Sequence, residues 1–267
     1  MKLLRGGLGQ LSLLIWSLPL FLLLCLPTLI LLGSLGSLSW LLSPEAGGAR
    51  EALSLSLTSS CWSTCITFVM GTPLAWLIAH NQNSGARIGV ALLTIPLMLP
   101  PSIIGLTLLE ATAQGGFLAS IFPYFAKLPF SFTAVLLAQI TVSAPLYILG
   151  AVSTFRQLDP ELIEVARCLG LNPFQAWRRV ALPLIAPSLL LALSLSTARA
   201  LGEFGATLLF AGNLVGVTQT APLAIYLELE KGTQGALALS LGLIGYALPI
   251  LGALAFLSRG RPLKPLR

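Results

Sequence analysis

Long apolar runs separated by short polar intervals organise this chain. Six runs of about 20 residues or more carry few charges, over residues 11–32, 52–79, 88–110, 131–154, 184–204 and 236–257. Runs of this length can cross a bilayer as helices. A transmembrane β-barrel would instead show segments of about 10 residues with alternating hydrophobicity. The pattern predicts an all-α integral membrane protein in which about six transmembrane helices form a single domain over residues 1–267.

Two parts of the pattern depart from simple spans. Pro96 and Pro100-Pro101 interrupt the third run. Because proline removes a backbone donor, such a break is tolerated where neighbours satisfy the freed carbonyls; it either lines a pathway or is a packing kink. Residues 205–235 are rich in Gly and Thr and are a candidate for dipping into the membrane. Residues 33–51 and 111–130 are interpreted as connectors.

The longest polar interval, residues 159–187, predicts two short helices joined by a glycine bend. Asp159 is an N-cap candidate before a proline at the first helical position, and two glutamates follow in the first turns. Gly170 is a natural residue just past a helix C-terminus. Asn172-Pro173 starts a second short helix in the same way, which places two aromatic residues on one side. Two helices with a bend and a return to an apolar run indicate a docking element.

The spacing within this interval resembles the EAA loop of ABC-importer permeases. Glu164-Val165-Ala166 is followed after three residues by Gly170, after nine more by Val180, and after one more by Leu182-Pro183. The family pattern has Ala where this chain has Val165, and Ile where it has Val180. The resemblance implies that about residues 156–183 form a cytoplasmic coupling helix that docks on an ATPase subunit. An ordinary amphipathic loop helix is the alternative.

The candidate docking residues are those of the motif together with polar and aromatic residues of the second short helix. They are Glu164, Ala166, Gly170, Asn172, Pro173, Phe174, Trp177, Arg178, Leu182 and Pro183. The dipeptide Gly-Lys does not occur, so the chain has no P-loop. The resemblance implies that ATP and Mg bind the partner ATPase, and that this chain is a non-catalytic subunit with no bound cofactor.

Composition narrows the class further. Hydrophobic residues make up 56% and charged residues 9% of the chain, against about 25% charged residues in soluble domains; the mean hydropathy is +0.91. A single His, His80, leaves no credible Ser-His-Asp, Cys-His or HExxH arrangement. The four cysteines are expected to be free, and Cys61 and Cys65 to be small buried thiols on a packed face rather than metal ligands. Serine and threonine beside them favour close helix packing.

The net charge of +6 is a topology signal rather than a nucleic-acid footprint. With six spans both termini share one side, and eleven basic residues lie there: Lys2, Arg5, Arg87, Arg156, Arg167, Arg178, Arg179, Arg259, Arg261, Lys264 and Arg267. Only Arg50, Lys127 and Lys231 lie on the other side. The positive-inside rule therefore predicts cytoplasmic termini and a cytoplasmic docking loop, and no nucleic-acid partner is expected. The resemblance to ABC-importer permeases implies that the membrane is a bacterial inner membrane.

Two charged residues lie within the fifth span. Arg199 and Glu203 are four residues apart, so they can pair on one helix face. Either alone would cost about 2.5–3.5 kcal/mol near the bilayer centre, so both are expected to face protein or water. The pair is either a station on an anion pathway or a structural pair that fixes helix packing.

A narrower resemblance lies around this pair. Residues 199–207 read R-A-L-G-E-F-G-A-T, and the segments 210–213 and 218–226 complete a similarity to the molybdate/tungstate permease subfamily. Sulfate permeases resemble the first segment and diverge further on. The resemblance implies a homodimer in the lipid bilayer, with ATPase subunits and an external oxyanion-binding protein.

The neutral side chains in these segments are candidate donors for a tetrahedral oxyanion, and such donors would let a dianion pass without trapping it. The candidate pathway residues are Arg199, Glu203, Thr207, Asn213, Thr218, Gln219 and Thr220. The polar side chains could instead only cap turns. Sulfate or thiosulfate is the alternative substrate. A stand-alone secondary transporter is the alternative class, although no internal repeat or lone intramembrane acid supports it.

Overall fold

The computed structural model describes residues 7–81 and 83–257, without the side chains of residues 7–15, 255 and 257. Within these ranges the chain is helical almost throughout and has no β-strand. The predicted basic residues Lys2 and Arg5, and those of the tail 258–267, lie outside the described residues. The all-α fold class predicted from the apolar runs is confirmed.

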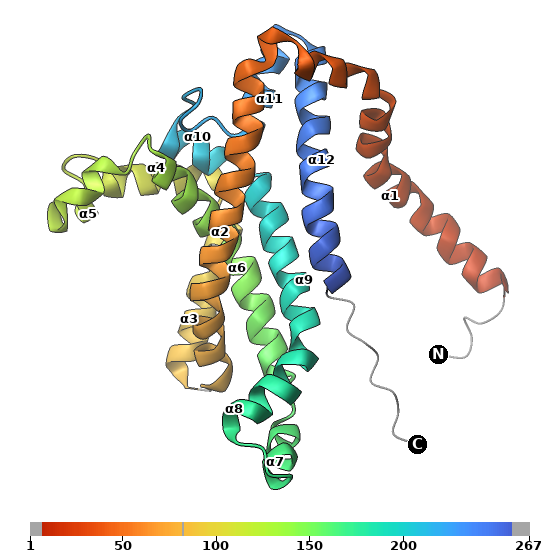
Figure 1. Cartoon of the computed structure of the whole chain (residues 1–267), viewed down its shortest axis with the longest axis vertical. Coiled ribbons are helices and arrows are strands. Elements are labelled where there is room, and N and C mark those ends of the chain that lie inside the picture. Colours follow the sequence, from red (N-terminus) through yellow and green to blue (C-terminus); the bar gives the residue numbers. More distant parts are fainter. Residues whose placement is uncertain (1–6, 82, 258–267) are drawn as a thin grey trace.

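The helices divide into long spans and short connecting elements. They are α1 (Gly7–Gly33), η1 (Leu35–Leu42), η2 (Pro44–Ala46), α2 (Gly47–His80), α3 (Ser84–Met98), α4 (Pro101–Thr112), α5 (Phe117–Ile121), η3 (Pro123–Lys127), α6 (Phe132–Arg156), α7 (Pro160–Cys168), α8 (Pro173–Ala176), η4 (Trp177–Ala181), α9 (Leu182–Leu201), α10 (Gly205–Ala211), α11 (Ala221–Lys231) and α12 (Thr233–Leu257). Figure 1 shows α2, α6, α9 and α12 as a central bundle, with α7 and α8 at one end and α1 slanting away at the side.

Six described helices are long and apolar enough to cross a membrane. Their number matches the prediction, but the third span does not lie where it was expected. It covers Pro101–Ile121 and so includes part of the predicted connector 111–130, whereas α3 is a shorter apolar helix. The expected third span divides at Leu99-Pro100 into α3 and α4, because two successive prolines leave no backbone donors to continue the helix. α3 itself runs through Pro96. The connector 33–51 is also largely helical, since η1 and η2 fill it and α2 begins at Gly47.

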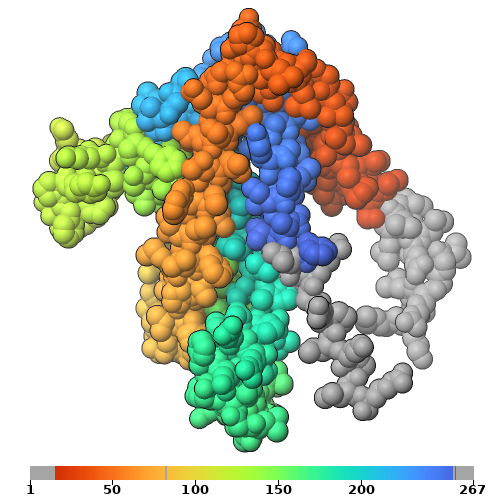
Figure 2. Space-filling view, in the orientation of Figure 1, coloured from red at the N-terminus to blue at the C-terminus, as the bar shows by residue number. Residues whose placement is uncertain are grey.

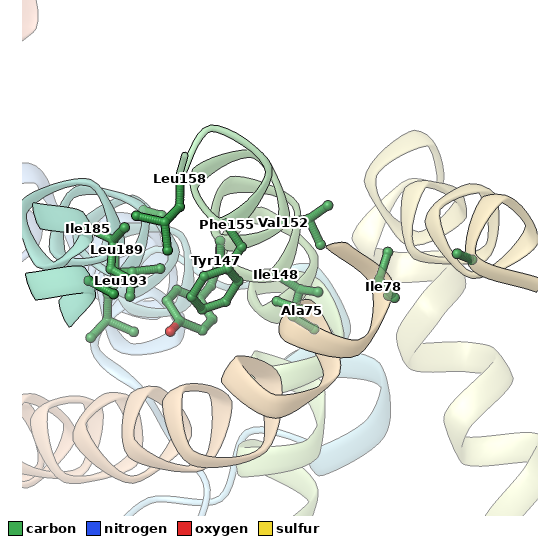
Figure 3. Close-up of a cluster of buried hydrophobic side chains, with 14 residues drawn as sticks. Ala75, Ile78, Tyr147, Ile148, Val152, Phe155, Leu158, Ile185, Leu189 and Leu193 are labelled. Atoms are coloured by element: carbon green, nitrogen blue, oxygen red, sulfur yellow. The ribbon is translucent and has the colours of Figure 1, made fainter. Parts of the chain in front are cut away.

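The main apolar core lies where α2, α6 and α9 meet. Tyr147 and Phe155 of α6 are almost fully buried there, beside Ile185 and Leu189 of α9 (Figure 3). The helices approach closely because α2 presents small residues. An ideal Cβ on Gly71 would lie 3.1 Å from Ile148 Cγ1. This cluster includes Leu158 and Ala181, so it extends to both ends of the docking loop.

Small polar residues pack α2 against its neighbours, as expected. Gln139 Nε2 donates to Ser59 Oγ at 3.1 Å, and the Thr72 and Tyr147 hydroxyls pair at 2.6 Å. Such bonds stabilise membrane helix pairs by about 1 kcal/mol each. The cysteines of α2 are free, as predicted, but the prediction that they are buried is wrong. Cys61 and Cys65 are exposed because the serines and threonines, rather than the thiols, occupy the packed face.

Candidate functional site

The docking loop begins at the end of α6 with a capped helix. Asp159 accepts the N–H of Glu161 at 2.9 Å, as an N-cap carboxylate does. At the other end of α7, the Gly170 N–H donates to the Arg167 carbonyl at 3.0 Å and the Leu171 N–H to the Ala166 carbonyl at 3.2 Å. This is a Schellman motif, and it requires the φ of +91° that Gly170 adopts. The predicted glycine bend is therefore present.

The second short helix is fixed by a capping box. Asn172 Oδ1 accepts the Gln175 N–H at 2.8 Å, and Gln175 Oε1 accepts the Asn172 N–H at 3.2 Å. From Pro173 the chain stays helical into the fifth span. The turn Trp177–Ala181 is a π-helix. A π-turn at this point accommodates the proline at residue 183, which has no N–H to donate into a regular α-helix.

The loop exposes an apolar patch that we call the docking patch, made of Leu162, Val165, Leu169 and Phe174. Leu169 is 80% exposed and Phe174 67% exposed, although both lie beside well-ordered caps. Exposed apolar patches on otherwise polar surface mark interaction sites. The sequence interpretation missed Leu162, Val165 and Leu169, although their spacing of three and four residues was the available signal.

The two aromatic residues of the second short helix differ in exposure. Phe174 is exposed, whereas Trp177 packs against the apolar core of α2, α6 and α9. The two residues lie three positions apart in the continuous helical stretch from α8 through the π-turn into α9, and a shared docking face stays a prediction. Of the other predicted docking residues, Glu164, Gly170, Asn172, Pro173, Arg178 and Pro183 are exposed, Leu182 is half-buried and Ala166 is buried.

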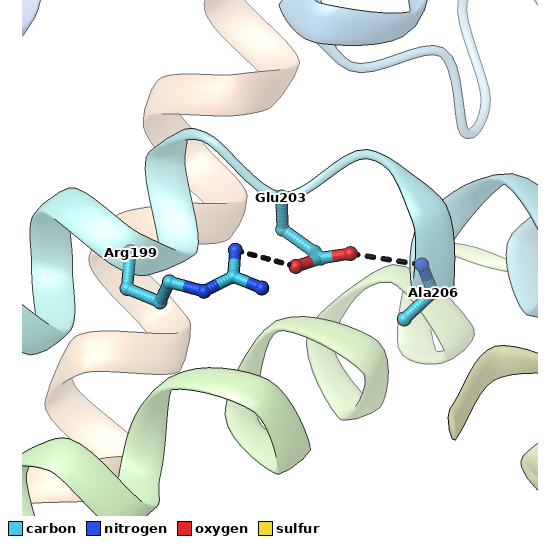
Figure 4. A network of polar contacts seen from close by, with 3 residues as sticks. All are labelled: Arg199, Glu203 and Ala206. Carbon is cyan, nitrogen blue, oxygen red and sulfur yellow. Dashed lines mark hydrogen bonds and ion pairs between the residues drawn. The ribbon is translucent and has the colours of Figure 1, made fainter. Parts of the chain in front are cut away.

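A second polar feature lies at the opposite end of α9. Arg199 Nη1 is 2.7 Å from Glu203 Oε2, so the predicted ion pair forms. The Arg199 side chain is 32% exposed and that of Glu203 only 1%. Glu203 Oε1 also accepts the N–H of Ala206 at 2.8 Å (Figure 4).

The predicted placement of this pair on one helix face is wrong. α9 ends at Leu201, and Glu203 lies in the link to α10. The carboxylate therefore ties the end of one helix to the beginning of the next. α10 in turn lies against α4, where an ideal Cβ on Gly105 would be 2.5 Å from the Ala206 carbonyl oxygen.

The neutral candidate pathway residues are mostly enclosed. Thr207, Thr218, Gln219 and Thr220 are buried and Asn213 is half-buried. Thr218 Oγ1 accepts the Leu214 N–H at 3.1 Å and so caps a turn. Three of these side chains have a buried oxygen with no hydrogen-bond partner among the described residues: the hydroxyls of Thr207 and Thr220, and Oδ1 of Asn213. Their role in a pathway stays a prediction.

One face of α9 is left open along its length. Leu184, Leu191 and Leu195 are exposed on it, and the partly exposed Arg199 lies one turn beyond Leu195. A groove of about 390 Å³ runs between α6 and α9 beside these leucines. The face is mostly apolar, with the exposed Ser188 between Leu184 and Leu191, and it ends at the ion-paired Arg199.

Two polar side chains that the sequence interpretation missed hold the site together. Ser56 Oγ of α2 accepts the Ala221 N–H of α11 at 2.6 Å, so a serine from another helix satisfies the beginning of α11. Gln139 of α6 is bonded to Ser59 and is also fully buried. A Ser residue every three or four positions on α2 was the only signal in the sequence.

Comparison with known proteins identifies the family to which this chain belongs. Residues 71–260 match the family described as "Binding-protein-dependent transport system inner membrane component". The chain is 38% identical to the molybdenum transport system permease protein ModB of Mycobacterium bovis over 206 residues, covering 76% of this chain and 78% of that protein. It is 32% identical to the protein of the same name from Escherichia coli, covering 79% and 95%. The sulfate transport system permease protein CysT of Salmonella typhimurium is 29% identical, covering 79% and 77%.

The fold also matches a solved structure. A bacterial ABC transporter involved in the import of the acidic polysaccharide alginate superposes with a TM-score of 0.71 at 18% identity, covering 98% of this chain and 99% of that chain. The chain belongs to the family of inner-membrane components of binding-protein-dependent transport systems.

Proposed function

We propose that this chain is the permease subunit of an ATP-driven importer for a tetrahedral oxyanion, molybdate or tungstate. The observation that carries the proposal is the 32–38% identity to relatives named molybdenum transport system permeases, which extends over more than two thirds of the chain. Sulfate is the second candidate, because a sulfate transport permease is 29% identical over a similar length.

The docking patch is the surface for a separate ATPase subunit. Leu162, Val165, Leu169 and Phe174 present apolar area, and Arg167 and Arg178 surround it with charge. ATP is bound and hydrolysed on that partner, and α7 and α8 transmit its movement to α9, with which α8 is continuous through the π-turn. The chain itself needs neither a catalytic residue nor a cofactor for this task.

A second copy of the chain completes the pathway. The open face of α9 carries Leu184, Leu191 and Leu195, and α1 exposes most of its side chains from Trp16 onward. Both surfaces suit a homodimer in the bilayer. Between two such faces, Arg199 would lie close to a passing anion. An external binding protein delivers the oxyanion to the end of the bundle formed by η1 and α11.

Uptake by the reconstituted complex tests the substrate. We expect ATP-dependent uptake of radiolabelled molybdate into vesicles that contain permease, ATPase and binding protein, with unlabelled tungstate competing strongly and sulfate weakly. A stronger competition by sulfate would assign the second candidate. Uptake without ATP or ATPase would contradict the importer class and favour a secondary transporter.

Gly170→Val is expected to disrupt coupling. Because Gly170 has a φ of +91° and nothing lies within 4 Å of an added Cβ, the strain comes from the backbone alone. A β-branched residue is disfavoured there by about 1–2 kcal/mol. The permease should remain folded, while co-purification of the ATPase and uptake both fall severalfold.

Gly170→Asn is the matched control, since asparagine tolerates this conformation better than valine. It should retain most of the ATPase binding and uptake. Wild-type co-purification and uptake in the valine variant would contradict a docking role for the bend.

Accessibility of introduced cysteines tests the orientation in the membrane. In a cysteine-free background, Glu161→Cys on α7 should react with an impermeant thiol reagent only from the cytoplasmic side. Glu45→Cys in η2 should react only from outside. Both positions are exposed, so a failure to react reflects sidedness rather than burial. The reverse pattern would overturn the proposal of cytoplasmic termini and a cytoplasmic docking loop.

A further inference from the structure

A hollow of about 640 Å³ lies beside the docking loop and outside the features described so far. It is formed where α2 ends, α3 begins, α6 ends and α7 begins. Its lining residues are Ala79, His80, Asn81, Ala86, Arg87, Phe155, Arg156, Leu158 and Pro160. The permease function proposed above gives this hollow no task.

The hollow is strongly basic. Arg87 and Arg156 line it together with His80, and none of its lining residues is acidic. Within the described parts of the chain, ion pairs join Arg199 to Glu203 and Lys231 to Glu228, so neither of the two arginines in the hollow belongs to one. The nearest acid in sequence, Asp159, accepts the N–H of Glu161 as the cap of α7. Two arginines that belong to no ion pair of the described residues therefore line one space.

Guanidinium groups bind phosphate oxygens in pairs of parallel hydrogen bonds. A phosphate in the hollow could belong to a lipid or be free in solution. α3 favours the lipid, because Ile88, Leu92 and Ile95 form one exposed apolar stripe that starts next to Arg87. Ile88 and Leu92 are each 59% exposed. This stripe offers an acyl chain a path along α3 while the headgroup occupies the hollow; a free anion would not use it.

We propose that this hollow binds the phosphate headgroup of an anionic phospholipid, with Arg87 and Arg156 as its ligands and the apolar stripe of α3 along its acyl chain. Basic pockets between transmembrane helices on the cytoplasmic side suit such headgroups. The lipid contacts Pro160, the first residue of α7, and so links the surrounding membrane to the docking loop. The proposal does not depend on which anion is transported.

Native mass spectrometry of the detergent-purified permease tests the proposal. We expect the wild-type chain to retain added phosphatidylglycerol in preference to phosphatidylcholine. Arg87→Gln/Arg156→Gln should bind phosphatidylglycerol about 30-fold more weakly, because each arginine near an anionic lipid contributes on the order of a fivefold preference. The matched control is Arg167→Gln/Arg179→Gln, which removes the same charge from exposed positions of the loop that do not line the hollow. This control variant should retain phosphatidylglycerol as the wild type does.

Three results would overturn the proposal. Equal retention of both lipids by the wild type needs no variant and would exclude an anionic headgroup site. Equal weakening in both double variants would reduce the effect to general surface charge. Displacement of phosphatidylglycerol by millimolar inorganic phosphate would assign the hollow to a free anion. So would a melting temperature that phosphate raises in the wild type but not in Arg87→Gln/Arg156→Gln.

Discussion

Gly105→Ala should reduce the yield of folded permease severalfold. It should also lower the melting temperature of the permease more than alanine does at any other glycine of α3 or α4. The added Cβ would lie 2.5 Å from the carbonyl oxygen and 2.7 Å from the Cα of Ala206. Both are backbone atoms, so no side chain can rotate away. Overpacking of this kind typically costs about 1–3 kcal/mol, and a contact with backbone lies at the upper end of that range.

The expected loss is not a general effect of replacing helical glycines, because alanine at an unobstructed helix position is favoured by about 0.5–1 kcal/mol. Gly89→Ala on α3 is the matched control. Its Cβ would meet Ile78 Cδ1 at an ordinary 3.7 Å. Thermal unfolding of both variants in detergent, followed by size-exclusion chromatography, makes the comparison. A melting temperature for Gly105→Ala equal to that of Gly89→Ala would show that α4 and α10 are less closely packed than the structure has them.

The contact between α4 and α10 also bears on the role of the prolines that separate α3 from α4. α4 begins at Pro101, directly after Leu99-Pro100, and an ideal Cβ on Gly205 would be 3.1 Å from the Ser102 N–H. The beginnings of α4 and α10 therefore pack backbone to backbone. Of the two interpretations of the prolines, a packing role is supported directly by these contacts. A pathway role stays a prediction.

Features that depend on local chemistry could be predicted from the sequence. Caps, the glycine bend and the restart at Asn172-Pro173 depend on residues within a few positions of one another, and the structure has each of them. The apolar runs likewise predict spans because length and hydrophobicity decide insertion. The division of the third run was partly visible, since prolines marked it without showing which of them ends the helix.

Features that depend on packing between distant segments could not be predicted. Ser56 satisfies Ala221 across 165 residues of sequence, and no local pattern indicates that pairing. The same holds for Cys61 and Cys65, whose exposure depends on which side of α2 meets α6. Glu203 was assigned to the fifth span although Gly202 is the C-cap of α9 and was an available signal for the end of the helix. Burial of the threonines at 207, 218 and 220 also follows only from the arrangement of α10 and α11.

The second large effect is expected at the ion pair, where the two single substitutions should differ. Arg199→Gln leaves the Glu203 carboxylate 1% exposed with only the Ala206 N–H as a donor among its observed partners. Breaking a buried pair in this way costs about 3–5 kcal/mol, and the partial exposure of Arg199 favours the lower figure. Glu203→Gln should cost less, because the glutamine oxygen can still accept from Ala206 and the remaining arginine is 32% exposed. Folded yield and melting temperature measure the difference.

The double variant Arg199→Gln/Glu203→Gln separates folding from transport. It leaves no uncompensated charge, so its folded yield should recover towards that of the wild type. Arg199 lies at the end of the open face of α9. If the proposed second copy encloses the anion there, molybdate uptake per folded complex should stay severalfold below wild type. Leu195→Ala, one turn away on the same exposed face, is the control for a change without loss of charge. Uptake near wild type in the double variant would remove Arg199 and Glu203 from the pathway and leave them as the residues that join α9 to α10.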